Sequence, residues 1–197
     1  MTAAIGLIGG IASGKSQASQ YFRDLGIDVI DTDLIARELV QPGSALLGKV
    51  IAHFGEDFLL PSHELDRFKL RSLIFQDPHA KIWLENLLHP AIRNEVAAQV
   101  KKSQSAYCIV AIPLLKRRKD YPFLNRILSI ETSDDLRIQR LQKRDQIKRD
   151  LARKMIDQQA TDAERRVIAD DVIVNDSDFH TLKEKIQALH ARYLIAH

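Results

Sequence analysis

The sequence predicts an α/β protein in which a parallel five-stranded sheet is flanked by helices. Three observations indicate this fold class. The chain opens with a short apolar run, a glycine-rich loop and a helical pattern. Further apolar runs of strand length then alternate with amphipathic helical segments, and the third run is apolar at almost every position. Such alternation is typical of parallel sheets, whose strands are covered on both faces.

The first strand, expected at residues 3–8, leads directly into Gly9-Gly10-Ile11-Ala12-Ser13-Gly14-Lys15-Ser16. This segment matches the phosphate-binding pattern GxxxxGK[ST] at every fixed position, and a helix expected at 15–25 follows it. In that pattern backbone N–H groups and the helix N-terminus surround phosphate oxygens, the lysine reaches the outer phosphates, and the final hydroxyl can bind Mg²⁺. The loop therefore predicts a P-loop NTPase-type site for a nucleoside triphosphate such as ATP, with Mg²⁺.

Two acidic residues follow the second strand, which is expected at 27–30. If the chain is still extended there, Asp31 and Asp33 point to the same side, at the sheet edge where ligands bind in open α/β folds. We expect Asp33 to be the general base for a hydroxyl acceptor and Asp31 to lie near the metal ion. Spacing alone also allows the reverse assignment, and Thr32 or Asp33 can instead cap the helix expected at 34–40.

Residues 41–105 have an almost continuous helical pattern, with helices expected at 45–54, 65–75 and 78–102. Asp77 and Pro78 form an N-cap and first-turn pair for the last of these. A strand-free stretch of about 65 residues is longer than a crossover between parallel strands requires. We interpret it as an inserted helical subdomain that binds the second substrate.

The remaining strands are expected at 107–115, 126–131 and 171–175. The third strand ends without the acidic residue that many P-loop ATPases carry there, which increases the importance of the two aspartates after the second strand. A solvated basic loop is expected at Lys116–Lys119. Capping boxes are expected at Thr132 and Thr161, and Asp178 is expected to cap a final helix.

Positive charge concentrates at residues 137–154, which hold eight lysines and arginines against two aspartates. We expect this segment to belong to a helical lid whose arginines contact the transferred phosphoryl group while water is excluded. A kinase needs this exclusion, because water competes with the acceptor. The absence of aromatic residues between Phe123 and Phe179 argues against a nucleic-acid surface that binds by stacking.

The chain has 197 residues, of which 45% are hydrophobic, and a formal net charge of +3. This is the composition of an ordinary globular protein. No apolar run approaches the roughly 18 residues of a membrane span, so we expect a cytoplasmic protein without a membrane partner. The single cysteine, Cys108, lies in an apolar run and is expected to be a buried apolar residue. We expect a monomer, while oligomeric state stays open.

Several motifs together resemble the dephospho-CoA kinase family, and the resemblance runs nearly from end to end. They are the phosphate loop, Asp31-Thr32-Asp33 with Ile35-Ala36-Arg37-Glu38-Leu39-Val40, His89-Pro90 with Ile92-Arg93, Pro113-Leu114-Leu115, Arg140-Leu141 with Arg144-Asp145, and Ala169-Asp170 with Val172-Ile173 and Asn175. The resemblance implies ATP-dependent phosphorylation of the ribose 3′-hydroxyl of dephospho-CoA, the last step of coenzyme A biosynthesis. It also implies a core at 1–33, 106–136 and 169–197, a CoA-binding insert at 34–105 and a lid at 137–168.

The resemblance assigns roles to individual residues, and these complete the predicted site together with Asp31, which spacing alone places near the metal ion. The catalytic group is Asp33, Lys15 and Arg140. The ATP-binding group is Gly9, Gly10, Ile11, Ala12, Ser13, Gly14, Lys15, Ser16 and Gln17, with Arg140 and Arg144. The acceptor is expected at Asp33, Arg37, His89 and Arg93, and the metal ion at Ser16 and Asp31.

One departure affects the acceptor pocket, because Lys116 and Arg117 stand where family members usually have an aromatic residue and a glutamate. Two other functions remain open at this level. The chain could be another small-molecule or nucleotide kinase of the same build, or a non-catalytic module that switches conformation with ATP. Turnover that depends on dephospho-CoA would distinguish a dephospho-CoA kinase from both of these alternatives.

Overall fold

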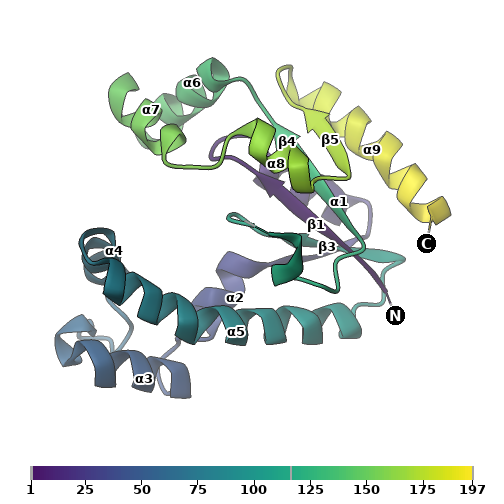
Figure 1. Ribbon diagram of the computed structural model, residues 1–197. Coiled ribbons are helices and arrows are strands. Elements are labelled where there is room, and N and C mark those ends of the chain that lie inside the picture. Colours follow the sequence, from purple (N-terminus) through teal and green to yellow (C-terminus); the bar gives the residue numbers. More distant parts are fainter. Residues whose placement is uncertain (1, 116, 197) are drawn as a thin grey trace. The chain divides into compact units, whose positions relative to one another are not determined.

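The computed structural model describes residues 2–115 and 117–196, and the chain divides into two compact units. The core unit runs to Asp31 and resumes at Gln99, and the helical unit comprises Thr32–Ala98. Figure 1 shows the elements of both units. Among the described residues, no helix is long and apolar enough to cross a membrane. The predicted division into core, insert at 34–105 and lid at 137–168 stays a prediction.

A parallel five-stranded sheet forms the centre of the core unit and confirms the predicted fold class. The strand order is β2-β3-β1-β4-β5, and the strands are β1 (Ala3–Gly9), β2 (Asp28–Asp31), β3 (Tyr107–Ala111), β4 (Arg126–Glu131) and β5 (Asp171–Val174). The central strand β1 pairs with β3 on one side and β4 on the other, and it is buried along its whole length. A strand that is buried on both faces has apolar residues at nearly every position, as β1 does.

Helices complete the core unit around this sheet. Residues of α1 (Lys15–Asp24) and α9 (Phe179–Ala196), among them Phe22 and Tyr193, share one buried cluster with the strands. The helices α6 (Asp134–Asp145) and α7 (Arg149–Asp157) enclose a second buried cluster. The helix α8 (Asp162–Ile168) contacts β1 and β4.

Two predicted caps are present in the core unit. The Thr161 side chain accepts from the Glu164 backbone N–H at 3.2 Å, while the Glu164 carboxylate accepts from the Thr161 N–H at 2.7 Å. This reciprocal pair is the capping box expected for α8. Asp178 accepts from the Thr181 N–H at 2.8 Å and so caps α9.

The helical unit holds α2 (Thr32–Glu38), α3 (Ala45–Phe54), α4 (Arg67–Gln76) and α5 (Pro78–Lys102), the last turn of which belongs to the core unit. Its own buried cluster includes Leu47, Val50 and Leu84, so the unit has an apolar core independent of the sheet. Asp77 caps α5 as predicted, because its carboxylate accepts from the His79 N–H at 2.8 Å.

Two predicted strand ends are wrong. β3 ends at Ala111, since Pro113 has no N–H to donate to a ladder and the chain turns there. β2 ends at Asp31 and α2 begins at Thr32. The expectation that Asp31 and Asp33 point to the same side required a chain that is still extended at Asp33, and this condition is not met because the chain is helical from Thr32.

The basic run Lys116–Lys119, which was expected to be a solvated loop, makes specific ion pairs and hydrogen bonds. Both Asp170 oxygens accept from Nη1 of Arg118 at 2.8 and 2.9 Å, and its Nη2 donates to the Asn125 carbonyl at 2.8 Å. Arg117 pairs with Asp120 at 2.9 Å. The first residue of the run, Lys116, lies outside the described residues.

Candidate active site

The phosphate loop lies between the end of β1 and the start of α1, at the carboxyl edge of the central strand (Figure 1). The Ser13 N–H donates to the Gly10 carbonyl at 3.1 Å and closes a turn. Gly14 has a φ of 99° and is the N-cap of α1, a backbone position that suits a residue without a Cβ. The first turn of α1 has no acidic residue, so the positive end of the helix dipole is not neutralised locally.

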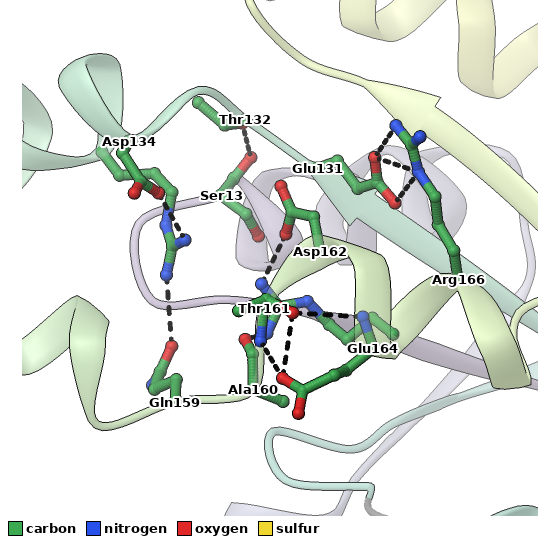
Figure 2. A network of polar contacts seen from close by, with 12 residues as sticks. Ser13, Glu131, Thr132, Asp134, Gln159, Ala160, Thr161, Asp162, Glu164 and Arg166 are labelled. Carbon is green, nitrogen blue, oxygen red and sulfur yellow. Dashed lines mark hydrogen bonds and ion pairs between the residues drawn. The ribbon is translucent and has the colours of Figure 1, made fainter.

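Side chains from distant segments hold the carbonyl groups of this loop. The Ser13 carbonyl accepts from Nδ2 of Asn175 at 2.8 Å and from the Thr132 hydroxyl at 2.9 Å, a contact drawn in Figure 2. The Ala12 carbonyl accepts from Nη1 of Arg140 at 3.2 Å. These donors lie outside the loop and fix the positions of its carbonyl groups.

Ile11 is held by both of its backbone groups. Its N–H donates to Oε1 of Gln159 at 2.7 Å, and its carbonyl accepts from Nε of Arg137 at 3.0 Å. Nη2 of Arg137 also reaches Gln159 at 3.3 Å, so the two side chains form one clamp. The clamp joins α6 and the chain after α7 to the loop.

Arg137 is a buried charge, with a side chain that is only 3% exposed. Burial lowers its pKa, the neighbouring Arg165 lowers it further, and the Asp134 carboxylate at 3.1 Å opposes both effects. Arg165 in turn donates to the Ala160 carbonyl and to Asp162. Both guanidinium groups are therefore fixed by hydrogen bonds rather than free to move.

This arrangement explains the glycine at position 10. A Cβ there would lie 2.7 Å from Cζ of Arg137 and 2.9 Å from Nη2 of Arg165. Neither arginine can shift without breaking the bonds described above. The arginines that pack against the loop thus constrain its sequence, in addition to its expected ligand.

A second buried carboxylate lies at the end of β4. Glu131 is 3% exposed, and Arg166 of α8 binds it through Nε and Nη2 at 2.6 to 3.0 Å (Figure 2). The bidentate pair links α8 to the strand next to the loop. The pair therefore holds α8 against β4.

The predicted ATP-binding residues all lie in the core unit. Lys15, Ser16 and Gln17 form the first turn of α1. Arg140 donates to three backbone carbonyls around the loop, and Arg144 pairs with Asp145 at 2.7 Å. Their roles as phosphate contacts stay predictions.

The predicted acceptor residues lie in the helical unit. Asp33 and Arg37 are exposed and one turn apart on α2, and His89 and Arg93 are one turn apart on α5. Each pair therefore shares a helix face. Asp31, the expected metal ligand, ends β2 in the core unit. Within residues 2–115 and 117–196, no group of three or more His, Cys, Asp or Glu side chains could hold a metal ion.

Sequence reasoning missed part of the loop's support. Thr132 was expected to cap α6, but the N-cap is Ser133 and the Thr132 hydroxyl is used for the Ser13 carbonyl instead. That expectation is wrong because a buried carbonyl outside the helix competes for the same donor. Nothing in the local pattern marks Gln159, whereas Asn175 stands in the family motif.

The comparisons with known proteins decide the family. The dephospho-CoA kinase family model matches residues 3–181. The chain belongs to the dephospho-CoA kinase family. A dephospho-CoA kinase of Coxiella burnetii is 44% identical over 191 residues, which cover 96% of each chain. One of Aeromonas hydrophila is 41% identical and covers 96% of this chain and 94% of the relative.

Solved structures agree with this family. The dephospho-CoA kinase of Campylobacter jejuni has a TM-score of 0.75 at 26% identity, with 100% of this chain and 99% of that chain covered. A shikimate kinase of Acinetobacter baumannii has a TM-score of 0.57 at 16% identity, with 98% and 94% covered, and this likeness shows the fold alone. The fold of this chain therefore also occurs in a kinase outside the family.

Proposed function

We propose that the chain transfers the γ-phosphate of ATP to the ribose 3′-hydroxyl of dephospho-CoA and so forms coenzyme A, the last step of its biosynthesis. The family match over residues 3–181 carries this proposal. The phosphate loop after β1 supports it, since its carbonyl groups are bound from outside by Thr132, Asn175 and Arg140. The enzyme is then a phosphotransferase with an alcohol group as acceptor.

ATP binds at the loop in this proposal. The backbone of the loop and the N-terminus of α1 receive the phosphate oxygens, and Lys15 neutralises charge on the outer phosphates. Arg140 and Arg144 supply further positive charge to the transferred group.

Asp33 acts as the general base. The acceptor 3′-oxygen forms a bond to the γ-phosphorus while the bond from that phosphorus to the β–γ bridging oxygen breaks. The hydroxyl proton passes to the Asp33 carboxylate, and ADP leaves with the electron pair of the broken bond. A positioned base of this kind typically contributes about 10²–10⁴-fold.

Ser16 and Asp31 would hold Mg²⁺. One hydroxyl and one carboxylate fit this ion, which usually binds through one or two carboxylates together with substrate phosphates and water. Both residues belong to the core unit. When bound, Mg²⁺ neutralises charge on the β- and γ-phosphate oxygens.

The acceptor binds to the helical unit, where Arg37, His89 and Arg93 contact it. The reaction is cytoplasmic, and the enzyme acts as a monomer on a small molecule rather than on nucleic acid. Each of these statements belongs to the proposal.

Formation of ADP from Mg-ATP tests the proposal, with dephospho-CoA, adenosine, AMP and shikimate as parallel acceptors. We expect strong stimulation by dephospho-CoA alone, with coenzyme A as the product. Stimulation by a different acceptor alone would refute the substrate assignment. Slow hydrolysis that is indifferent to every acceptor would indicate a conformational switch instead of a kinase.

A further inference from the structure

The phosphate loop contains a strained backbone position at Ala12. This residue has a φ of 60°, in the left-handed region that residues with a Cβ rarely adopt. It is the third of the four residues in the turn that the Ser13 N–H closes on the Gly10 carbonyl at 3.1 Å. A positive φ at this position of a turn is usual for glycine or asparagine. An alanine here has a cost in free energy that the surrounding structure must offset.

Side chains from outside the loop hold the peptide planes on both sides of Ala12. The plane before it carries the Ile11 carbonyl, which accepts from Nε of Arg137 at 3.0 Å. The plane after it carries the Ala12 carbonyl, which accepts from Nη1 of Arg140 at 3.2 Å. A peptide unit is rigid, so the orientations of these two planes together fix the φ and ψ of Ala12. The two arginines therefore hold this residue in the left-handed region.

Gln159 acts one peptide plane earlier and also on one of these arginines. Its Oε1 accepts from the Ile11 N–H at 2.7 Å, which holds the plane between Gly10 and Ile11. The same oxygen accepts from Nη2 of Arg137 at 3.3 Å. Gln159 thus orients the guanidinium group that binds the Ile11 carbonyl. One side chain therefore contributes to the positions of two successive peptide planes.

Apolar packing alone would not select this backbone conformation. Ile11 and Ala12 are partly buried and pack against the apolar cluster of α6 and α7. Such contacts have no preferred direction, whereas a hydrogen bond weakens steeply when its angle changes. The packing brings the loop and the two helices together, and the hydrogen bonds of the clamp set the orientation of the peptide groups.

Gln159 is the part of the clamp that a substitution can remove with the least disturbance, because it is uncharged. Replacing Arg137 would remove a buried charge that is paired with Asp134 at 3.1 Å, and this would affect the fold as well as the loop. When the Gln159 amide is removed, Arg137 keeps its bonds to Asp134 and to the Ile11 carbonyl.

We propose that Gln159 is a positioning residue that holds the phosphate loop, strained at Ala12, in its nucleotide-binding conformation before ATP arrives. Gln159 acts through the Ile11 backbone and Arg137 and not through contact with the reacting atoms. The inference rests on the proposed function and deepens it, because it names a side chain outside the loop on which ATP affinity depends.

The expected effect is on ATP affinity rather than on turnover. Without Gln159 a smaller fraction of the molecules has a binding-competent loop, and the apparent affinity falls by that fraction. ATP restores the loop conformation when it binds, so the complex that reacts is the same in both proteins. A change of this kind increases the KM for ATP and leaves kcat unchanged.

Gln159→Met tests the proposal, since methionine has a similar length and no oxygen acceptor. We expect the KM for ATP to increase about 2- to 10-fold, which corresponds to the loss of one hydrogen bond. The Kd of a non-hydrolysable ATP analogue, measured by calorimetry, should increase by the same factor. The kcat and the KM for dephospho-CoA should not change.

Two further variants make the test specific. Gln158→Met is the matched control, because Gln158 is the adjacent residue and its side chain is exposed; it should leave every constant unchanged. Ala12→Gly tests the link to the strained position, because glycine adopts a positive φ without a steric cost. The effect of Gln159→Met on the Kd of the analogue should therefore be smaller in the Ala12→Gly background than in the wild-type background.

The proposal is overturned if Gln159→Met leaves the affinity for the analogue unchanged, or if its effect is equal in both backgrounds. It is also overturned if Gln159→Met lowers the melting temperature and kcat with an unchanged KM for ATP, since Gln159 would then only stabilise the fold. Failure of the proposed function looks different: wild-type protein would bind the analogue but form no coenzyme A. The calorimetric comparison would still test the role of Gln159 in that case.

Discussion

Replacing Thr132 with valine should loosen the phosphate loop without removing any charged group. The Thr132 hydroxyl is buried at the end of β4, within 2.9 Å of the Ser13 carbonyl and 3.1 Å of the Asn175 carbonyl. It also accepts from Nη1 of Arg140 at 3.3 Å. Valine has nearly the same shape, so the change removes the hydroxyl and leaves no cavity.

The magnitude follows from the donors that remain. The Ser13 carbonyl keeps Nδ2 of Asn175 at 2.8 Å, and the Asn175 carbonyl keeps Nη2 of Arg140 at 3.0 Å. Neither carbonyl is left without a partner, so the loss is that of one ordinary hydrogen bond, about 0.5–1.5 kcal/mol. For a chain of this size the melting temperature should fall by about 1–6 °C. The KM for ATP should increase by no more than about tenfold.

Circular dichroism melting and steady-state kinetics measure the two effects, with Thr132→Ser as the matched control. Serine keeps the hydroxyl and loses a methyl group, so it should also lose about 1 kcal/mol of stability. Only valine should increase the KM for ATP. An unchanged KM in the valine variant, or an equal increase in the serine variant, would refute the role of this hydroxyl in positioning the loop.

Three further predictions concern other parts of the chain. Asp33→Asn should lower kcat by about 10²–10⁴-fold with nearly unchanged ATP affinity; full activity would exclude Asp33 as the base. Burial, with a smaller effect from Asp28, raises the pKa of Cys108 to about 11, so a thiol reagent at pH 8 should label it only after unfolding; rapid labelling of folded protein would contradict its burial. Burial opposes ionisation of Asp171, but the Arg126 guanidinium and Tyr193 hydroxyl, both at 2.9 Å, hold its pKa below the ordinary value. Asp171→Asn should therefore cost about 1–3 kcal/mol at pH 7. This difference should shrink as the pH falls below about 4, where Asp171 of the unfolded chain takes up a proton, and should be lost below the lowered pKa of the folded state; urea unfolding at pH 7 and at acidic pH measures it, and a constant difference would disprove the linkage.

Local patterns predicted most of the elements correctly. The helix expected at 45–54 and the strand expected at 126–131 have those bounds in the structure, and the caps at Asp77, Thr161 and Asp178 are present. Each depends on residues within a few positions of one another, which is why single-sequence reasoning finds them.

The errors share a different cause. Thr132 has the sequence of a capping residue, but a buried carbonyl of Ser13 takes its hydroxyl, 119 residues away in the chain. Arg118 stands in a basic run, but its Nη1 donates to both Asp170 oxygens and so fixes it. In both cases a distant partner overrides the local preference, and that partner is not visible in the pattern.

The sequence by itself determined the fold class, the phosphate loop and the family, because periodicity, capping and motif spacing are properties of neighbouring residues. Only the tertiary structure decided what supports the loop: Gln159 binds Ile11 across 148 residues, and Asn175 binds Ser13 across 162. It also placed Arg137 and Arg140 on the carbonyl groups of Ile11 and Ala12. Contacts of this kind form because buried polar groups must find partners when the chain collapses, and the choice of partner depends on the packed arrangement rather than on the order of residues.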